Sequence, residues 1–449
     1  MKKLSKSSKI AIFFLLTGIY FFSYFHRIAV PGTIFNEIQA TFNLSASGVA
    51  TLGTLCLYIY GFMQFFAGIL ADAFGALRVL LTGGALLTAG SFAFSLAPEV
   101  GTLFASRALV GFGASLIYVC LFKFLHQLFS SRDFPAFLGL ALFIGYAGGL
   151  FGTLPLERLV YWLSWRLAFV WISGVSFVFL VAAAILTRYK IGFLSQERSS
   201  FSGEMMWQVY TNQESFPIII CAVINFAIYF LMQAMLGRKF LQDFASFSSL
   251  TATGFTCLMI FVSMSASLLA GFSTRFLNRR KPIMMAATVI CLLAVSLLLA
   301  GVSGLRLGKL FLLPYLLLGL CSGASLVFST SVREINPAQA VGTAVGFLNG
   351  VCYLSIALLM NLSGWVMDFF APRRMDSPGS IIYPAGAYRS IFAGCWVLAF
   401  ISLLVCLRIK ETAGNKQEVL KTEPAVEEKK GRKEQKKKNQ QEEEQLTLF

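Results

Sequence analysis

Long apolar stretches, separated by short polar breaks, make up the chain from about residue 10 to residue 407. A run of about 18 or more apolar residues is long enough for a helix to cross a hydrocarbon core of about 30 Å. Each such stretch therefore predicts one membrane-spanning helix. The twelve predicted spans cover residues 10–30, 48–71, 79–97, 102–124, 135–155, 164–187, 216–236, 251–271, 282–302, 308–331, 343–367 and 387–407.

The longest polar break inside this apolar region divides the spans into six and six. It covers residues 188–215. The tetrapeptide GASL begins at Gly113 in the fourth span and recurs from Gly323 in the tenth, which suggests two related halves. The sequence thus predicts an all-α membrane protein of two pseudo-symmetric six-helix bundles. The predicted parts are an N-terminal segment 1–9, bundles 10–187 and 216–408, the linker 188–215, and a tail 409–449 too polar to build a core.

Composition supports a membrane protein and excludes several other classes. Hydrophobic residues make up 57% of the chain and charged residues 13%, against about 25% charged in soluble domains. The net charge of +16 lies mostly in the polar breaks and in the tail, so it indicates membrane topology and not nucleic-acid binding. Lys and Arg are more frequent in the breaks on the side of the N-terminus. We therefore expect both termini in the cytoplasm of a multi-pass plasma-membrane protein that acts as a monomer. The Lys-rich tail is expected to be solvated, with contact to anionic lipid as the alternative.

Motifs for enzymes, metals and nucleotides are missing from the sequence. The nine cysteines lie in apolar spans without a C-x-x-C pair, so they predict packing and no metal site. No P-loop and no usable Ser/His/Asp, metal-ligand or paired-acid set is present. We therefore expect neither an enzyme nor a bound cofactor.

Two stretches in the first half, GILADAFGALR at residues 68–78 and RALVGFG at residues 107–113, resemble motifs of the major facilitator superfamily of secondary transporters. Residues 68–78 are similar to its G-x-L-A-D-R-x-G-R-K-x motif, with Ala73 in place of the usual Arg. Residues 107–113 are similar to its R-x-x-x-G-x-G motif. The resemblance implies the twelve-helix fold of that family and transport by alternating access. It leaves the transported solute open, because the family is very broad in substrate.

The first of these motifs predicts a gate. Gly68 and Gly75 allow close helix approach and a tight turn, and Asp72 at a helix end can pair with a basic group or a helix N-terminus. We expect Gly68, Asp72, Gly75 and Arg78 to hold one cytoplasmic face shut without touching solute. The alternative is a simple turn-forming loop.

Arg27 and Arg107 are basic residues inside predicted spans, and the sequence places no Asp or Glu beside them. An arginine at the bilayer centre costs about 2.5–3.5 kcal/mol on insertion scales, so each arginine needs compensation. Counting at 1.5 Å per residue puts the two at similar depth. An anionic solute held by the guanidinium forks is the compensation we expect, and in related organic-anion transporters arginines of the first and fourth helices play this part. The alternatives are snorkelling of Arg27 to the headgroups, and a structural or proton-coupling role for Arg107.

Polar side chains at helical spacing extend the predicted binding site along four helices. Such tips on apolar helices suit a small hydrogen-bonding solute, although helix-to-helix hydrogen bonds are an equal alternative for any one of them. Besides the two arginines, the predicted solute-binding residues are Tyr20, Tyr24, Tyr118, Asn225, Tyr229, Asn349 and Tyr353.

His26 is the titratable group nearest neutrality in the predicted membrane zone close to Arg27. Many members of the resembled family carry Asp at this position, so a His here argues against carboxylate-based proton coupling. We weigh a proton-coupling role for His26 against a packed, hydrogen-bonded histidine.

These observations predict a transporter of a small hydrophilic solute with an anionic or zwitterionic character. Organic acids, sugar phosphates, amino acids and dipeptides fit this description, with or without a coupling proton or cation. Two alternatives stay open. One is an efflux transporter of hydrophobic or cationic compounds, which would more naturally need a buried acid. The other is a transporter-like membrane sensor that binds solute and signals through its linker or tail.

Overall fold

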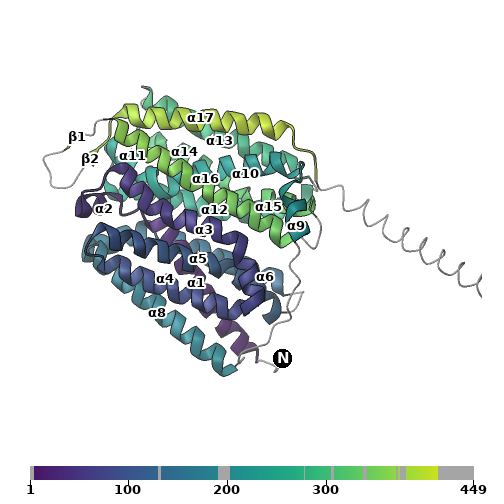
Figure 1. Ribbon diagram of the computed structural model, residues 1–449. Helices are drawn as coiled ribbons and strands as arrows, with labels where there is room; N and C mark the ends of the chain where they lie inside the picture. Colours follow the sequence, from purple (N-terminus) through teal and green to yellow (C-terminus); the bar gives the residue numbers. More distant parts are fainter. Residues whose placement is uncertain are drawn as a thin grey trace, which may run out of the picture.

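The computed structural model describes residues 5–129, 133–190, 203–277, 279–304, 308–336, 341–370, 373–374 and 381–412. Three predicted parts extend outside these ranges. They are the N-terminal segment at residues 1–4, the linker at residues 191–202 and the tail at residues 413–449. Within them the chain is almost entirely helical, as predicted (Figure 1). Eleven described helices are long and apolar enough to cross a membrane. A bent helix pair gives a twelfth span if it is counted as one.

The first half of the chain forms one helical bundle, coloured purple to teal in Figure 1. Its long helices are separated by short turns. Apolar residues occur on all sides of them, as expected where one side faces lipid and the other faces protein. Its helices are α1 (Lys6–Ala29), α2 (Phe35–Phe42), α3 (Ala46–Phe74), α4 (Ala76–Leu96), α5 (Val100–Leu128), α6 (Phe134–Phe151), α7 (Leu154–Leu163) and α8 (Trp165–Lys190).

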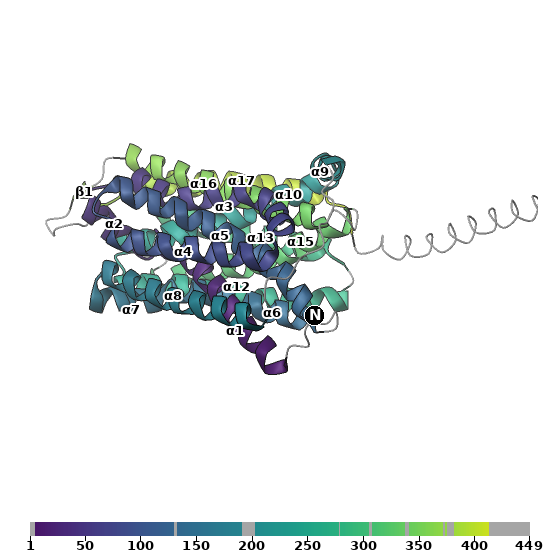
Figure 2. The same ribbon diagram turned by 60° about the horizontal axis from the view of Figure 1, so that its bottom comes forward.

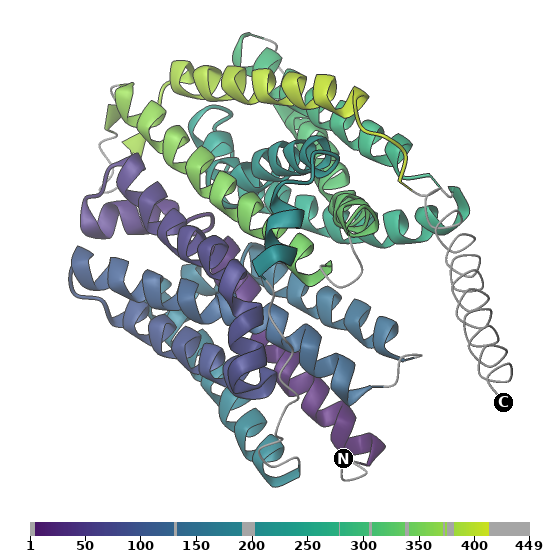
Figure 3. The same ribbon diagram turned by 45° about the vertical axis from the view of Figure 1, so that its right-hand side comes forward.

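The second half forms the other bundle, and the two bundles lie side by side (Figures 1 and 3). Its helices are α9 (Gly203–Tyr210), α10 (Ser215–Leu231), the π-helix η1 (Met232–Leu236), α11 (Gly237–Asp243), α12 (Ser249–Leu277), α13 (Lys281–Val302), the 3₁₀ turn η2 (Gly308–Phe311), α14 (Leu312–Gly323), α15 (Ser325–Glu334), α16 (Val341–Phe369) and α17 (Ala385–Leu407). Strands β1 (Arg373–Arg374) and β2 (Ile381–Ile382) pair antiparallel between α16 and α17.

Short elements distinguish the two ends of the molecule. We call the end that carries α2 and the β1–β2 pair the hairpin end. The opposite end, where α1 begins and α17 ends, is the terminal end (Figures 1 and 2). The sequence pattern did not predict α2, α9 or the strands, because they are too short for a hydrophobic period to show.

Some spans differ in shape from the prediction. The fifth span consists of α6 and α7, bent by 42°, and the tenth is divided between α14 and α15. The seventh does not end at residue 236 but continues through η1 and α11 to Asp243. Arg238 and Lys239, which we predicted in a polar break, therefore lie in a helix and are 4% and 2% exposed. Their charges lower the mean hydropathy of the sequence after residue 236, so the predicted span ended there. In the fold, carboxylates neutralise both side chains.

The two bundles meet along α3 and α16, which run beside each other through the centre of the molecule (Figure 3). Gly61 of α3 and Gly350 of α16 face each other there. A methyl group on Gly61 would lie 3.1 Å from the carbonyl oxygen of Gly350. Small residues permit this close approach of two backbones in a membrane.

Candidate functional site

Arg27 lies at the interface between the two bundles, on the last turns of α1. Its side chain is 2% exposed, and its Nη1 donates a 2.7 Å hydrogen bond to the hydroxyl of Tyr353 on α16. Its guanidinium carbon lies 4.5 Å from the ring centre of Tyr24 and 4.6 Å from that of Tyr60. These aromatic faces attract the guanidinium charge. Residues from both halves therefore hold this cation.

Further tyrosines continue this arrangement around Arg27. The ring centres of Tyr60 and Tyr353 are 4.5 Å apart, those of Tyr24 and Tyr146 5.0 Å, and those of Tyr20 and Tyr118 5.6 Å. We call this group the tyrosine cluster: Tyr20, Tyr24, Tyr60, Tyr118, Tyr146 and Tyr353. The sequence analysis included four of its six members. It missed Tyr60 and Tyr146, because neither lies at helical spacing from an intramembrane arginine or asparagine.

Glycines of α6 make room for two of these rings. A methyl group on Gly145 would overlap the ring of Tyr20, and one on Gly149 would lie 2.9 Å from the ring of Tyr24. The spacing of four residues puts both glycines on the face of α6 that meets α1. The glycine-rich sequence of α6 thus allows α1 to present its tyrosines next to Arg27.

The charge of Arg27 has no carboxylate partner among the described contacts. Its Nε donates to the backbone carbonyl of Ser23, at 3.2 Å, and its Nη2 has no hydrogen-bond partner although it is buried. A buried guanidinium with an unused N–H group costs free energy unless water or a ligand satisfies it. The tyrosine cluster therefore contains an unsatisfied cationic donor.

Arg107 does not join Arg27. Its side chain is fully buried inside the first bundle, where its Nη2 lies 3.3 Å from the carbonyl oxygen of His26 and 3.4 Å from that of Val30. Its guanidinium carbon lies 5.8 Å from the ring centre of Phe94 on α4. No described hydrogen bond or cation–π contact joins these residues to the guanidinium of Arg27. The similar depth predicted for the two arginines does not bring them to one site, since depth does not specify the side of α1 that each one meets.

The polar residues predicted on the second half lie in different places. Tyr229 is buried beside Phe226, which contacts Tyr353, so it borders the tyrosine cluster. Asn225 points into the second bundle, where it donates to Thr288 of α13 at 3.0 Å and accepts from Ser402 of α17.

Asn349 of α16 links the two halves in another way, because it donates to Gln64 of α3 at 3.2 Å. Asn225 and Asn349 therefore use their amides in helix-to-helix hydrogen bonds, the alternative considered from sequence. These hydrogen bonds do not support the predicted contact of either asparagine with solute.

His26 packs among aromatic residues of the first bundle and has no described ring contact with the tyrosine cluster. Its ring centre is 5.5 Å from that of Phe25 and 5.8 Å from that of Phe169 on α8, and neither ring nitrogen has a partner. It is packed inside the first bundle. This position does not place it against a solute at Arg27.

The predicted gate residues lie at the terminal end, where Gly68 and Asp72 belong to the last turns of α3, Gly75 separates the helices and Arg78 is in the first turn of α4. The carbonyl oxygen of Gly68 accepts a 2.9 Å hydrogen bond from Lys123 of α5. Gly75 ends α3 with a φ of 91°, a conformation that favours glycine, and Arg78 is exposed. The side chain of Asp72 lies outside the described part of the structure, so its predicted pairing stays a prediction.

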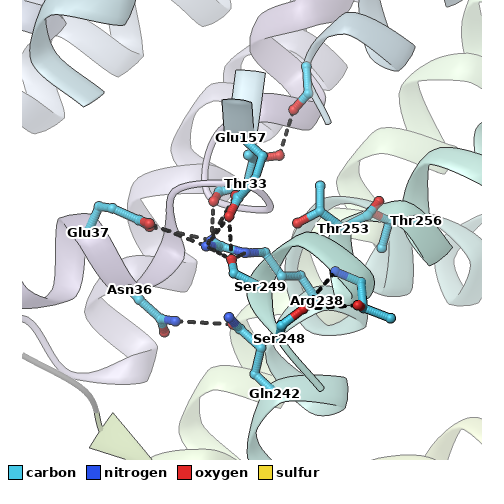
Figure 4. Close-up of polar contacts among 12 residues, drawn as sticks. Thr33, Asn36, Glu37, Glu157, Arg238, Gln242, Ser248, Ser249, Thr253 and Thr256 are labelled. Atoms are coloured by element: carbon cyan, nitrogen blue, oxygen red, sulfur yellow. Dashed lines mark hydrogen bonds and ion pairs between the residues drawn. The ribbon is translucent and has the colours of Figure 1, made fainter. Parts of the chain in front are cut away.

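A network that the sequence analysis missed joins the two halves at the hairpin end (Figure 4). Arg238 of α11 forms ion pairs of 3.2 Å with Glu37 of α2 and with Glu157 of α7. It also donates to the carbonyl oxygen of Thr33 and to the hydroxyl of Ser249. Four segments converge on one buried guanidinium, and three of them belong to the first half.

Further hydrogen bonds also join the two halves at the hairpin end. Gln39 donates to the Tyr383 hydroxyl at 2.9 Å, and both carboxylate oxygens of Asp368 accept from backbone N–H groups at the start of α3, those of Ala46 and Ser47, at 2.8 and 2.9 Å. Burial raises the pKa of Tyr383 to about 12, so it stays a neutral phenol. Within the second half, Lys239 pairs with Asp243 at 2.7 Å. The hairpin end of this structure is closed.

Residues 16–360 match the model of the Major Facilitator Superfamily, and they make up most of the chain. The chain belongs to the Major Facilitator Superfamily. The fold and the family are those of membrane transporters, so the resemblance inferred from residues 68–78 and 107–113 is confirmed. Several curated and solved proteins resemble this member of the superfamily at low sequence identity.

Among curated proteins, the transporter is 25% identical over 399 residues to the multidrug resistance protein Stp of Mycobacterium tuberculosis, covering 75% of this chain and 72% of that protein. It is 22% identical over 355 residues to the magnetosome protein MamZ of Magnetospirillum gryphiswaldense, covering 74% of this chain and 53% of MamZ. A match to human monocarboxylate transporter 7, 28% identical over 102 residues, covers 22% of this chain and 20% of that protein. The chain thus spans about half of MamZ and a fifth of monocarboxylate transporter 7.

Solved structures share the fold at low sequence identity. One is a POT family transporter in complex with 5-aminolevulinic acid, with a TM-score of 0.72 and 12% identity over 90% of this chain and 96% of that one. Another is a bacterial homologue of the human lysosomal transporter Spinster, with a TM-score of 0.70 and 16% identity over the same shares. The nucleoside transporter NupG has a TM-score of 0.68 and 17% identity over 89% of this chain and 99% of that one.

Proposed function

We propose that this superfamily transporter carries a small solute with a carboxylate or another anionic group, and that Arg27 binds that group. The single observation that supports this most strongly is the state of Arg27. It is buried at the interface of the two halves, with no carboxylate partner and with Nη2 unsatisfied. A solute anion would supply the missing charge and the missing acceptor together.

The chemistry of the surroundings fits such a solute. A guanidinium fork binds a carboxylate or phosphate in bidentate geometry, and Nη2 offers a free donor for it. The tyrosine hydroxyls can donate to or accept from further polar groups of the solute. Amino acids, short peptides, organic acids and sugar phosphates carry groups of this kind.

We further propose that transport alternates between closure at the hairpin end and closure at the terminal end. The Arg238 network would be the gate at the hairpin end, because it bonds α11 to α2 and α7. Gly68, Asp72, Gly75 and Arg78 would form the opposite gate. The excess of Lys and Arg at the terminal end supports a cytoplasmic position for that end in the plasma membrane.

The test is a ligand screen by thermal stability of the detergent-purified protein, because a ligand of the folded state stabilises it by RT ln(1 + [L]/Kd). Organic acids, sugar phosphates, amino acids and dipeptides are compared with lipophilic cations. We expect stabilisation by one anionic or zwitterionic class, lost in Arg27→Gln and partly kept in Arg27→Lys. Arg166→Gln is the matched control, since Arg166 donates to the carbonyl oxygens of Ser95 and Ala97 inside the first half.

Other outcomes would favour the other functions considered from sequence. Stabilisation by lipophilic or cationic compounds that is unaffected by Arg27→Gln would contradict the proposal and favour efflux, in keeping with the similarity to the multidrug resistance protein Stp. Binding of an anion to protein in proteoliposomes without any flux would instead favour a sensor.

A further inference from the structure

Arg107 is a second buried cation whose charge is not balanced, and it lies outside the proposed solute site. It is 0% exposed, and only its Nη2 has hydrogen-bond partners, the carbonyl oxygens of His26 and Val30. Its Nε and Nη1 have none. Its own helix α5 and the neighbouring helices α1, α4 and α8 contain no Asp or Glu in their sequences. The one acid of α3, Asp72, is 16 residues, or about 24 Å of helix, beyond Cys56, the residue of α3 that packs against Gly111 of α5. The backbone carbonyls at the end of α1 offset part of the charge, yet two nitrogen atoms keep unused N–H groups.

His26 is a neighbour of Arg107, because its backbone carbonyl oxygen accepts from Nη2 of Arg107 at 3.3 Å. Its ring packs 5.8 Å from Phe169, the Phe169 ring lies 5.1 Å from that of Phe94, and Phe94 lies 5.8 Å from the guanidinium carbon of Arg107. Both ring nitrogens of His26 are buried without a partner. The hydroxyl of Ser23, one turn earlier on α1, is also buried and unpartnered.

These unpartnered groups can supply several hydrogen-bond donors: Nε and Nη1 of Arg107, the hydroxyl of Ser23 and one ring nitrogen of His26, since a neutral imidazole carries one N–H. Buried polar atoms are nearly always satisfied by protein, water or an ion, so a cluster of this size needs an explanation. Water would satisfy the donors but would leave the charge of Arg107 unbalanced. An anion would do both.

We infer that the first bundle holds a small monovalent inorganic anion, of the size of chloride, between Arg107 and His26. One unbalanced positive charge calls for a single negative charge. The ion must be small because the site is enclosed, with Arg107 0% and His26 1% exposed. Bound there, the anion would fix the end of α1 against α5 and α8. This inference does not depend on the identity of the transported solute.

The first experiment compares thermal unfolding of the purified transporter in potassium chloride and in potassium gluconate at equal potassium concentration. We expect the midpoint of unfolding to rise with chloride in a saturable manner, and bromide to replace chloride. A crystal grown in bromide should show an anomalous peak between Arg107 and His26. Absence of that peak at a bromide concentration that saturates the stabilisation would overturn the inference and leave water in the space.

Variants distinguish this site from two other arginines of the protein, Arg27 and Arg166. Arg107→Gln should abolish the chloride-dependent rise, and His26→Leu should weaken the apparent chloride affinity at least threefold. Arg166→Gln, which changes an arginine that also bonds helix-end carbonyls, should keep the full rise. Loss of the chloride effect in Arg27→Gln but not in Arg107→Gln would move the anion to the solute site and contradict the inference. The anomalous measurement needs no variant, so it decides the question even if Arg107→Gln does not fold.

Discussion

Among the residues that the structure describes, three arginines are almost fully buried, and each is accommodated in a different way. Arg238 has two carboxylate partners, Glu37 and Glu157. Arg107 donates to the carbonyl oxygens at the end of α1. Arg27 has aromatic faces and one tyrosine hydroxyl. Since carboxylates balance the charge of Arg238 fully, it suits a structural lock, whereas Arg27 keeps the capacity to bind an anion.

At the scale of the residue, Tyr353→Phe tests how Arg27 is held. The change removes the hydroxyl that accepts from Nη1 and keeps the ring. A hydrogen bond to a charged group contributes about 1.5 kcal/mol or more, so we expect solute affinity to fall by about tenfold. Isothermal titration with the solute found in the screen gives the value. Tyr60→Phe is the control, because Tyr60 contacts Arg27 through its ring face. Equal affinities in wild type and Tyr353→Phe would show that the hydroxyl does not position Arg27 for binding.

At the scale of the element, small residues decide how closely the helices approach. Gly148 of α6 meets the backbone of α1, where an added methyl group would overlap the carbonyl oxygen of Phe21. Gly145 and Gly149 on the same helix accommodate Tyr20 and Tyr24. The contact of α1 with α6 therefore sets the position of the tyrosine cluster relative to Arg27.

Gly148→Ala should accordingly destabilise the protein and weaken solute binding together. A methyl group inserted between two backbones forces them apart, at a cost of about 1–3 kcal/mol. Gly139→Ala is the matched control in α6, since an added methyl group there meets nothing within 4 Å. Thermal unfolding in detergent measures both variants. A Gly148→Ala protein as stable as Gly139→Ala would show that α1 and α6 can separate without cost.

At the scale of the whole molecule, the two halves are joined along α3 and α16 and locked at the hairpin end. The lock combines Arg238 with Glu37 and Glu157, Gln39 with Tyr383, and Asp368 with the start of α3. Alternating access requires these contacts to break together while the helix packing inside each half persists. The population of the closed hairpin end should therefore depend on Arg238.

Arg238→Gln should shift the molecule toward an open hairpin end. Removing one partner of a buried ion pair costs roughly 3–5 kcal/mol, and we expect the lower end because Glu37 is 27% exposed. Spin labels at the exposed positions Ala40 and Leu250 report the separation of the halves by pulsed electron resonance. Arg389→Gln serves as the control, since Arg389 bonds Val302 within its own half. An unchanged distance distribution in Arg238→Gln would exclude this network as the gate.

The sequence by itself determined the class of fold, because crossing a bilayer needs long apolar helices and their number and order can be counted along the chain. It also identified Arg27 and Arg107, since a charge inside an apolar run is visible without any structure. Only the tertiary structure decided their environments. Which side of α1 meets α16 and which side meets α5 depends on packing between helices far apart in sequence. For the same reason the sequence did not reveal the roles of Tyr60, Tyr146 and the Arg238 network. Their partners come from helices far apart in the chain, which no local pattern connects.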